Sequence, residues 1–128
     1  MVKTILRLAA EHDMLSFVDD QRGHPTFARD AAQAVRQLMS ERRPGLFHVT
    51  NQGAVSWYEF ARAVLESSGQ DPERVQPIST ADLDPPRPAP RPANSVLDNA
   101  AMRICGLPLL PHYRPSLDDL VAELAQTP

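Results

Sequence analysis

Two polar segments of the chain carry the side chains best suited to binding chemistry. The first, residues 18–26, reads Val-Asp-Asp-Gln-Arg-Gly-His-Pro-Thr. Its glycine and proline predict a turn that frees backbone N–H groups, and the candidate binding residues are Gln21, Gly23, Pro25 and Thr26. The alternative is that the two aspartates and the threonine of this segment only satisfy their own turn. Sequence alone leaves both interpretations open.

The second segment follows a run of prolines. Residues 85–92 contain five prolines, which neither donate to a sheet nor continue a helix, so a stiff extended loop is predicted. The guanidinium of Arg91 can hold a diphosphate through two parallel hydrogen bonds, and a stiff loop lowers the entropy lost on binding. Asn94 and Ser95 are candidate hydrogen-bonding neighbours, and Arg87 is a weaker candidate. The alternative is that Arg91 is an ordinary solvated loop arginine.

For the other chemically capable residues, a structural role is the favoured interpretation. Trp57 can stack on a base or a sugar, but it belongs to the apolar stripe of a predicted helix, so core packing is expected. Tyr58 and Arg62, at i and i+4, are interpreted as a partly exposed helix face. The four histidines lie far apart and lack metal-ligand spacing, so no metal site is predicted.

Length and composition narrow the classes of function. The 128 residues suffice for one domain, and a net charge of −3 with scattered arginines argues against a nucleic-acid partner. The single cysteine rules out an internal disulfide. Neither a membrane-spanning run nor a signal-peptide pattern is found, so the cytoplasm is the expected compartment.

Apolar periodicity and capping residues predict a mixed α/β chain. Ser56 and Glu59 form a capping-box pattern that starts a helix, and Gly69 is placed to end it in a left-handed conformation. A last helix is predicted to be capped by Ser116. Further helices are predicted at 2–9, 28–40 and 99–105, and strands at 15–20, 46–50 and 75–78. The apolar face of helix 28–40 is expected to hold Ala31, Val35, Leu38 and Met39.

Four segments together resemble the dTDP-4-dehydrorhamnose reductase family in order and spacing. They are residues 2–9, 19–26, 47–51 with 56–61, and 91–98. The resemblance implies the mixed α/β C-terminal substrate-binding portion of an extended short-chain dehydrogenase, a Rossmann-like fold, with residues 1–128 as a single domain. The N-terminal cofactor half is expected to be absent, and the start of the chain inside a helical pattern fits that expectation. The implied reaction is the NADPH-dependent reduction of dTDP-4-dehydro-L-rhamnose in rhamnose biosynthesis.

The chemistry of that family needs two motifs that this chain lacks. The five glycines are too widely spaced for a dinucleotide fingerprint, and Lys3 is the only lysine, so the Tyr-x-x-x-Lys pair is missing. The resemblance therefore predicts a dTDP-sugar ligand, but no NADPH bound to this chain alone and no turnover. The expected partner is the missing N-terminal half or a second copy of the chain, because an orphaned strand at 46–50 would expose a sheet edge. Two alternatives are a non-catalytic regulatory or interaction module and part of a reductase for another dTDP-4-ketodeoxysugar.

Overall fold

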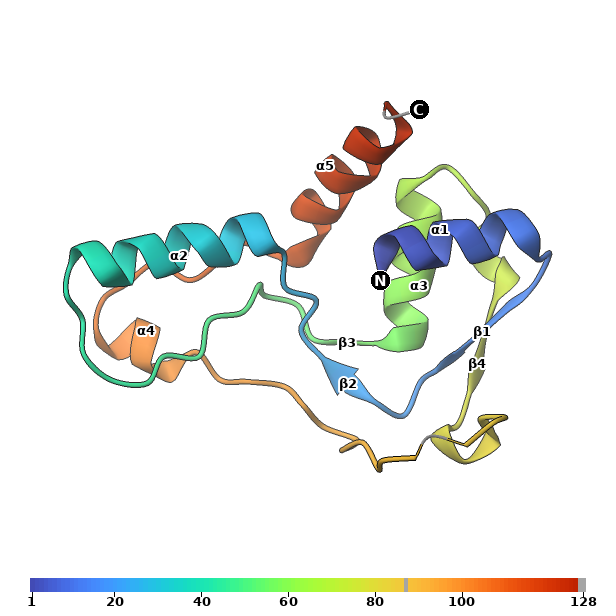
Figure 1. Ribbon diagram of the computed structural model, residues 1–128, viewed down its shortest axis with the longest axis horizontal. Coiled ribbons are helices and arrows are strands. Elements are labelled where there is room, and N and C mark those ends of the chain that lie inside the picture. Colours follow the sequence, from blue (N-terminus) through green and yellow to red (C-terminus); the bar gives the residue numbers. More distant parts are fainter. Residues whose placement is uncertain (87, 127–128) are drawn as a thin grey trace.

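A computed structural model describes residues 1–86 and 88–126, and it has two lobes (Figure 1). One lobe contains α1 (Val2–Glu11), α3 (Trp57–Ser67) and a two-stranded parallel sheet of β1 (Leu15–Val18) and β4 (Val75–Ile78). The other contains α2 (Ala28–Ser40) and α4 (Ala100–Ile104). Helix α5 spans Tyr113–Ala125. None of the described helices is long and apolar enough to cross a membrane.

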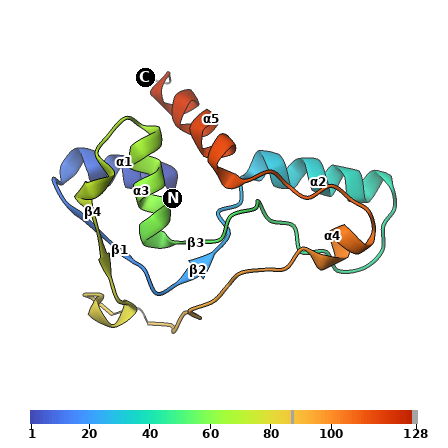
Figure 2. The ribbon, with the colours of Figure 1, turned by 180° about the vertical axis from the view of Figure 1, so that it is seen from behind.

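Short elements connect the lobes. Strand β2 (Arg22–Gly23) pairs antiparallel with β3 (Val55–Ser56), directly before α3. Two 3-10 turns, η1 (Pro72–Arg74) and η2 (Thr80–Asp82), flank β4. Residues 85–86 and 88–92 form neither helix nor strand, and Arg87 lies outside the described residues. Seen from behind, the segment that follows them crosses below β2 toward α4 (Figure 2).

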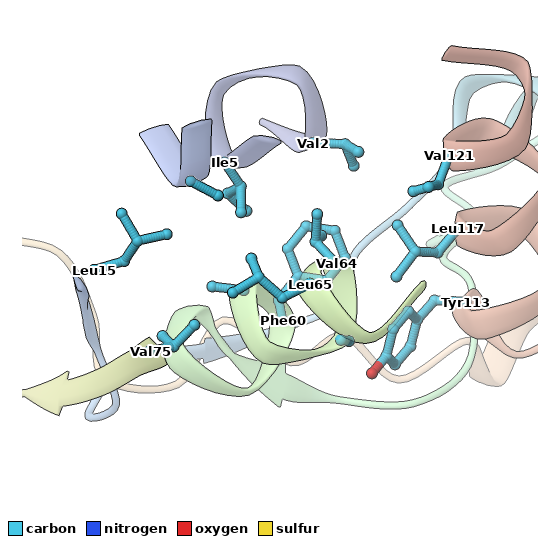
Figure 3. Close-up of a cluster of buried hydrophobic side chains, with 13 residues drawn as sticks. Val2, Ile5, Leu15, Phe60, Val64, Leu65, Val75, Tyr113, Leu117 and Val121 are labelled. Atoms are coloured by element: carbon cyan, nitrogen blue, oxygen red, sulfur yellow. The ribbon is translucent and has the colours of Figure 1, made fainter. Parts of the chain in front are cut away.

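The main apolar core lies where α1, α3 and α5 meet the parallel sheet (Figure 3). Ile5, Val64 and Leu117 are buried there, one from each helix. A smaller cluster around Ala34 and Met102 lies between α2 and α4. Each helix buries one stripe, as the 3.6-residue period requires, and burial of such side chains supplies about 1.5–3 kcal/mol each.

Several local predictions are confirmed. Ser56 and Glu59 form both hydrogen bonds of a capping box, with distances of 3.0 and 2.7 Å. Gly69 has φ of 73°, in the left-handed region where a glycine ends a helix without strain. The predicted helix 28–40 has the bounds of α2, and strand 75–78 pairs with β1.

Two predictions about segments 46–50 and 28–40 are wrong. Residues 46–50 form no strand, and Leu46 is 82% exposed, because no strand among the described residues lies beside them. On α2, Val35 and Met39 are 48% and 73% exposed, and the buried residues are Asp30 and Ala34.

The last helix begins four residues earlier than predicted, with His112 rather than Ser116 as its cap. It starts at Tyr113 after His112, whose Nδ1 accepts a hydrogen bond from the Arg114 N–H. Pro115 is tolerated because N–H groups in a first helical turn need no partner within the helix. Ser116 is therefore not the cap, and its hydroxyl instead donates to Asp30 Oδ2 at 2.6 Å.

A buried polar cluster joins the two lobes, centred on the fully buried Asn51. Its Nδ2 donates to Asp30 Oδ2 at 2.6 Å and to the Pro111 carbonyl at 3.1 Å. Its Oδ1 accepts from the Phe27 N–H at 2.9 Å. With the hydroxyl of Ser116 on the same carboxylate, the cluster connects the start of α2, the loop before α3 and the start of α5.

Substitution of Asn51 should destabilise the protein strongly. Asn51→Ala leaves the Phe27 N–H and part of the Asp30 carboxylate unsatisfied in a buried site, which should lower the free energy of unfolding by about 2–3 kcal/mol. Urea unfolding followed by circular dichroism measures this. Gln33→Ala, at an exposed position of α2, is the matched control and should change the free energy by less than about 0.5 kcal/mol. Equal midpoints for the two variants would contradict the role of the cluster.

Candidate functional site

A cleft with a volume of about 630 Å³ lies beside β2. Its walls come from five parts of the chain that are distant in sequence. These are residues 1–3 at the start of α1, residues 21–28, residues 55–57 with Phe60 at the start of α3, residues 91–92 with Ser95, and Leu120 of α5.

Backbone hydrogen bonds fix the relative positions of three of these walls. β2 pairs with β3 on one side, with Arg22 opposite Ser56. On its other side, the Arg22 N–H donates to the Ala93 carbonyl and the Ser95 N–H donates to the Arg22 carbonyl, both at 2.8 Å. Three extended segments therefore lie side by side, with β2 in the middle. Arg91 lies two residues before one outer segment, and Trp57 directly follows the other.

Six of the seven predicted binding residues line this cleft. They are Gln21, Gly23, Pro25, Thr26, Arg91 and Ser95. Asn94 is not among the lining residues, and its Oδ1 accepts from the Val96 N–H at 2.9 Å. Gly23 belongs to strand β2, and its φ lies outside the left-handed region. The prediction that Gly23 forms a turn is therefore wrong. A binding role for these residues remains a prediction.

The amide of Gln21 is used within the protein. The residue is buried, and its Nε2 donates to Thr80 Oγ1 at 2.8 Å. Thr80 Oγ1 in turn donates to Asp20 Oδ1 at 2.5 Å, and the Thr80 N–H donates to Asp20 Oδ2 at 2.8 Å. These bonds hold the pKa of Asp20 below its ordinary value, with the Thr80 hydroxyl as the largest cause. Gln21 therefore anchors the polar segment 18–26 to η2.

The two aspartates of segment 18–26 bond mainly to distant residues rather than within their own turn. Asp19 Oδ1 accepts from Ser56 Oγ at 2.5 Å, which joins the end of β1 to the cap of α3. Asp20 accepts from η2, as described above. Only Thr26 bonds locally, since its hydroxyl donates to the His24 carbonyl at 3.3 Å. The alternative of purely local turn bonds is thus wrong for the aspartates and correct for Thr26.

The charged side chains that line the cleft are all cationic. They are Lys3, Arg22 and Arg91, and none of the lining residues in the described ranges is acidic. Arg22 pairs with Glu59 at 3.0 Å, whereas Lys3 and Arg91 form no ion pair within residues 1–86 and 88–126. Because the whole chain carries a net charge of −3, this local excess of positive charge favours an anionic ligand.

Trp57 is not the core residue that its helical stripe predicted. It is 37% exposed and lines the cleft, with its ring edge-on to Phe60 at 6.4 Å between centroids. Trp57 is the first residue of α3, so its side chain reaches beyond the core that Phe60, Val64 and Leu65 fill. Together with Val55 it gives the cleft an apolar wall.

His24 also lines the cleft, and sequence reasoning did not select it. Its Nδ1 is buried and has no hydrogen-bond partner among the described residues. Buried polar atoms without a partner are uncommon in proteins, so this nitrogen distinguishes the site from an ordinary surface hollow. Its position between Gly23 and Pro25, inside a segment already chosen for its chemistry, was the signal that could have identified it.

The residues present do not form a cradle for the pyrophosphate of a dinucleotide. Such a cradle needs glycines at the start of a helix that follows a strand. Gly69 and Gly106 follow the C-terminal ends of helices, and Gly53 packs against the ring of His112, so none of these opens a helix. Tyr58 and Arg62 lie outside the cleft, and the tyrosine hydroxyl accepts from Arg62 at 3.2 Å.

Comparison with known proteins decides the family. Residues 1–126 match the family described as RmlD substrate binding domain. The chain belongs to this family.

Several proteins similar to this chain are named as reductases. A dTDP-4-dehydrorhamnose reductase of Mycobacterium tuberculosis is 41% identical over 98% of this chain and 41% of its own length. A dTDP-4-keto-6-deoxy-D-glucose reductase of Streptomyces niveus is 33% identical over 91% of this chain and 40% of its own length. The fold of a Bacillus anthracis dTDP-4-dehydrorhamnose reductase, solved in complex with NADP, matches with a TM-score of 0.87 at 31% identity. That match covers 96% of this chain and 43% of the other. The family member therefore spans about two fifths of these relatives.

The hydrogen bonds that anchor Gln21 predict a measurable change at Asp20. Thr80→Val removes the hydroxyl but keeps the backbone N–H, so the pKa of Asp20 should rise toward its ordinary value near 3.8. A lowered pKa in the folded state stabilises the protein above pH 3.8, and this stabilisation is lost as the pH falls through the folded-state pKa. Thr80→Val should therefore lose part of this stabilisation above pH 3.8. NMR titration of the Asp20 carboxyl carbon measures the shift.

Thr4→Val, on an exposed face of α1, is the matched control for this titration. It should leave the pKa of Asp20 unchanged. The same titration curve for wild type and Thr80→Val would show that the hydroxyl does not act on Asp20.

Proposed function

We propose that this chain is the dTDP-sugar-binding part of a reductase similar to dTDP-4-dehydrorhamnose reductase. The observation that carries the proposal is the cleft beside β2, which has cationic lining residues and an apolar wall in an otherwise acidic chain. A nucleoside diphosphate sugar combines an anionic diphosphate with a flat base and so matches both features. The names of the Mycobacterium tuberculosis and Streptomyces niveus relatives, both reductases of dTDP-linked sugars, support the same ligand class.

In this proposal Arg91 binds the diphosphate. It is exposed, it lines the cleft, and no acidic side chain of the described residues competes for it. Its guanidinium offers a planar pair of N–H groups that fits phosphate oxygens. The hydrogen bonds of Ala93 and Ser95 to Arg22 hold the neighbouring backbone in place. Less entropy is then lost when a ligand is bound.

Isothermal titration calorimetry with dTDP tests this assignment. Arg91→Ala should weaken binding by roughly ten- to hundredfold, because a charged hydrogen-bonding group contributes about 1.5–3 kcal/mol. Arg36→Ala removes the same charge from an exposed position of α2 outside the cleft and should leave the affinity unchanged. Equal weakening by both substitutions would reveal only a long-range charge effect. Unchanged binding by Arg91→Ala would remove Arg91 from the site.

The proposed reaction is an NADPH-dependent reduction of a dTDP-4-keto sugar, for which this chain supplies the sugar-nucleotide wall. Its residues do not form a dinucleotide cradle, and the sequence contains no Tyr-x-x-x-Lys pair. We therefore assign neither hydride transfer nor proton transfer to residues of this chain. Gln21, through Thr80, and Arg22, through Glu59, hold the wall in place.

The purified chain should be inactive as a reductase on its own. With NADPH and dTDP-4-dehydro-L-rhamnose, the decrease in absorbance at the NADPH band should not exceed the rate without protein. A full-length relative under the same conditions serves as the positive control. Turnover that increases in proportion to the concentration of this chain would contradict the assignment.

Exposed apolar residues support a polypeptide partner. Val35, Met39, Leu46 and Ile104 are all exposed in the lobe of α2 and α4. Because the chain spans about two fifths of its relatives, we propose that the cofactor-binding part of such a reductase covers this lobe. The expectation of self-association rested on an open strand at 46–50, and that strand is not formed.

A second candidate substrate is another dTDP-4-ketodeoxysugar. The relative of Streptomyces niveus is named as a dTDP-4-keto-6-deoxy-D-glucose reductase, and it matches nearly the whole chain. The features of the cleft concern the carrier nucleotide rather than the hexose. Both substrates are therefore compatible with the same cleft. The further alternative, a non-catalytic interaction module derived from this fold, is favoured only by the exposed lobe.

A further inference from the structure

We infer that Trp57 is the platform on which the nucleobase of the bound nucleotide stacks. This inference rests on the proposed function and deepens it, because it assigns the base end of the ligand to a side chain. Trp57 is 37% exposed in a folded helix and lines the cleft. A tryptophan presents a larger apolar face than any other side chain, and stacking on a base uses that face whatever the base.

The backbone below Trp57 is held firmly. Ser56, its neighbour, accepts a hydrogen bond from the Glu59 N–H and donates one from its hydroxyl to Asp19. The Ser56 N–H donates to Glu59 Oε2 at 2.7 Å. The ring itself packs edge-on against Phe60, with an interplanar angle of 73°. A ring held this way loses little conformational freedom when it binds a ligand, which favours affinity.

The position of Trp57 relative to Arg91 suits a nucleoside diphosphate. β2 lies between the two segments from which these residues project, so their backbones are separated by two interstrand spacings, or about 10 Å. In a nucleoside diphosphate, one ribose separates the base from the diphosphate. With the diphosphate on Arg91, the base can therefore reach Trp57 across β2.

The distribution of polar and apolar side chains supports the same orientation. Trp57 has Phe60 and Val55 beside it, and all three line the cleft. The acidic residue nearest in sequence, Glu59, is paired with Arg22 at 3.0 Å, so its charge does not repel the nucleotide. Base stacking is favoured on an apolar wall, whereas the diphosphate is favoured at the cationic residues.

Two probes distinguish the contribution of the base to binding from that of the phosphates. The probes are dTDP, which carries both groups, and inorganic pyrophosphate, which lacks the base. Trp57→Ala should raise the Kd for dTDP by roughly 5- to 150-fold, the range for one lost base–aromatic stack, and should leave the Kd for pyrophosphate unchanged. Trp57→Phe keeps a smaller aromatic face and should restore part of the affinity for dTDP. Arg91→Ala should weaken the binding of both probes.

Trp57 is also the only tryptophan of the chain, so it reports directly on its own contact. Saturating dTDP should quench its fluorescence, and saturating pyrophosphate should not. This measurement uses the unmodified chain and does not depend on how well Trp57→Ala folds.

Each other outcome overturns a specific claim. If dTDP binds without quenching the Trp57 fluorescence, the stacking role is wrong and the proposed function stands. The same conclusion follows if wild type, Trp57→Phe and Trp57→Ala bind dTDP with equal affinity. If Trp57→Ala weakens dTDP and pyrophosphate equally while its circular dichroism spectrum is unchanged, Trp57 only shapes the cleft, and the stacking role is again wrong. If wild type binds neither dTDP nor pyrophosphate, the proposed function fails and the inference fails with it.

Discussion

The hydrogen bonds of Asn51 are the constraint on which the arrangement of the two lobes depends. The apolar clusters in the two lobes do not share a buried residue, so hydrophobic contact alone does not fix their relative position. Asn51 bonds at once to Asp30 of α2, to the Pro111 carbonyl before α5 and to the Phe27 N–H. Each of these bonds has a direction as well as a distance. A satisfied buried network therefore specifies one orientation where an apolar contact would allow several.

The same cluster fixes one end of the cleft wall. Residues 21–27 run from Gln21, which is bonded to Thr80 of η2, to Phe27, which is bonded to Asn51. Both ends of this segment are thus held by hydrogen bonds to residues from other parts of the chain, the Thr80 hydroxyl at one end and the Asn51 amide at the other. His24 lies between the two anchors and faces the cleft with the segment. The acidic and amide residues that first suggested binding chemistry largely serve to hold the wall in shape, and the groups available to a ligand come from neighbouring positions.

The features of the fold and of the cleft that could be predicted from the sequence are those that depend on residues close together in the chain. The capping box of Ser56 and Glu59 and the end of α3 at Gly69 involve residues within a few positions of one another, and both were predicted. The segment 46–50 has the composition of a strand, but a strand also needs a neighbour, which the described chain does not provide. The placement of Ser116 was wrong because its partner, Asp30, is 86 positions away. Six predicted binding residues reached one cleft, whereas Trp57 was missed because helical periodicity assigned it to the core.

A cleft that holds the base and the diphosphate recognises the carrier of the sugar and leaves the hexose to other residues. In the proposed binding mode, Trp57 and Arg91 would contact parts of the ligand that are the same in every dTDP-linked sugar, so this part of a reductase would not need to change when the hexose changes. The relatives fit this division, since reductases named for two different dTDP-sugars match this chain at 41% and 33% identity over nearly its whole length. Under this proposal, selection among hexoses would fall to a part of the reductase outside this cleft. Binding of the carrier and choice of the reacting sugar would then be separable, because each would depend on a different section of the polypeptide.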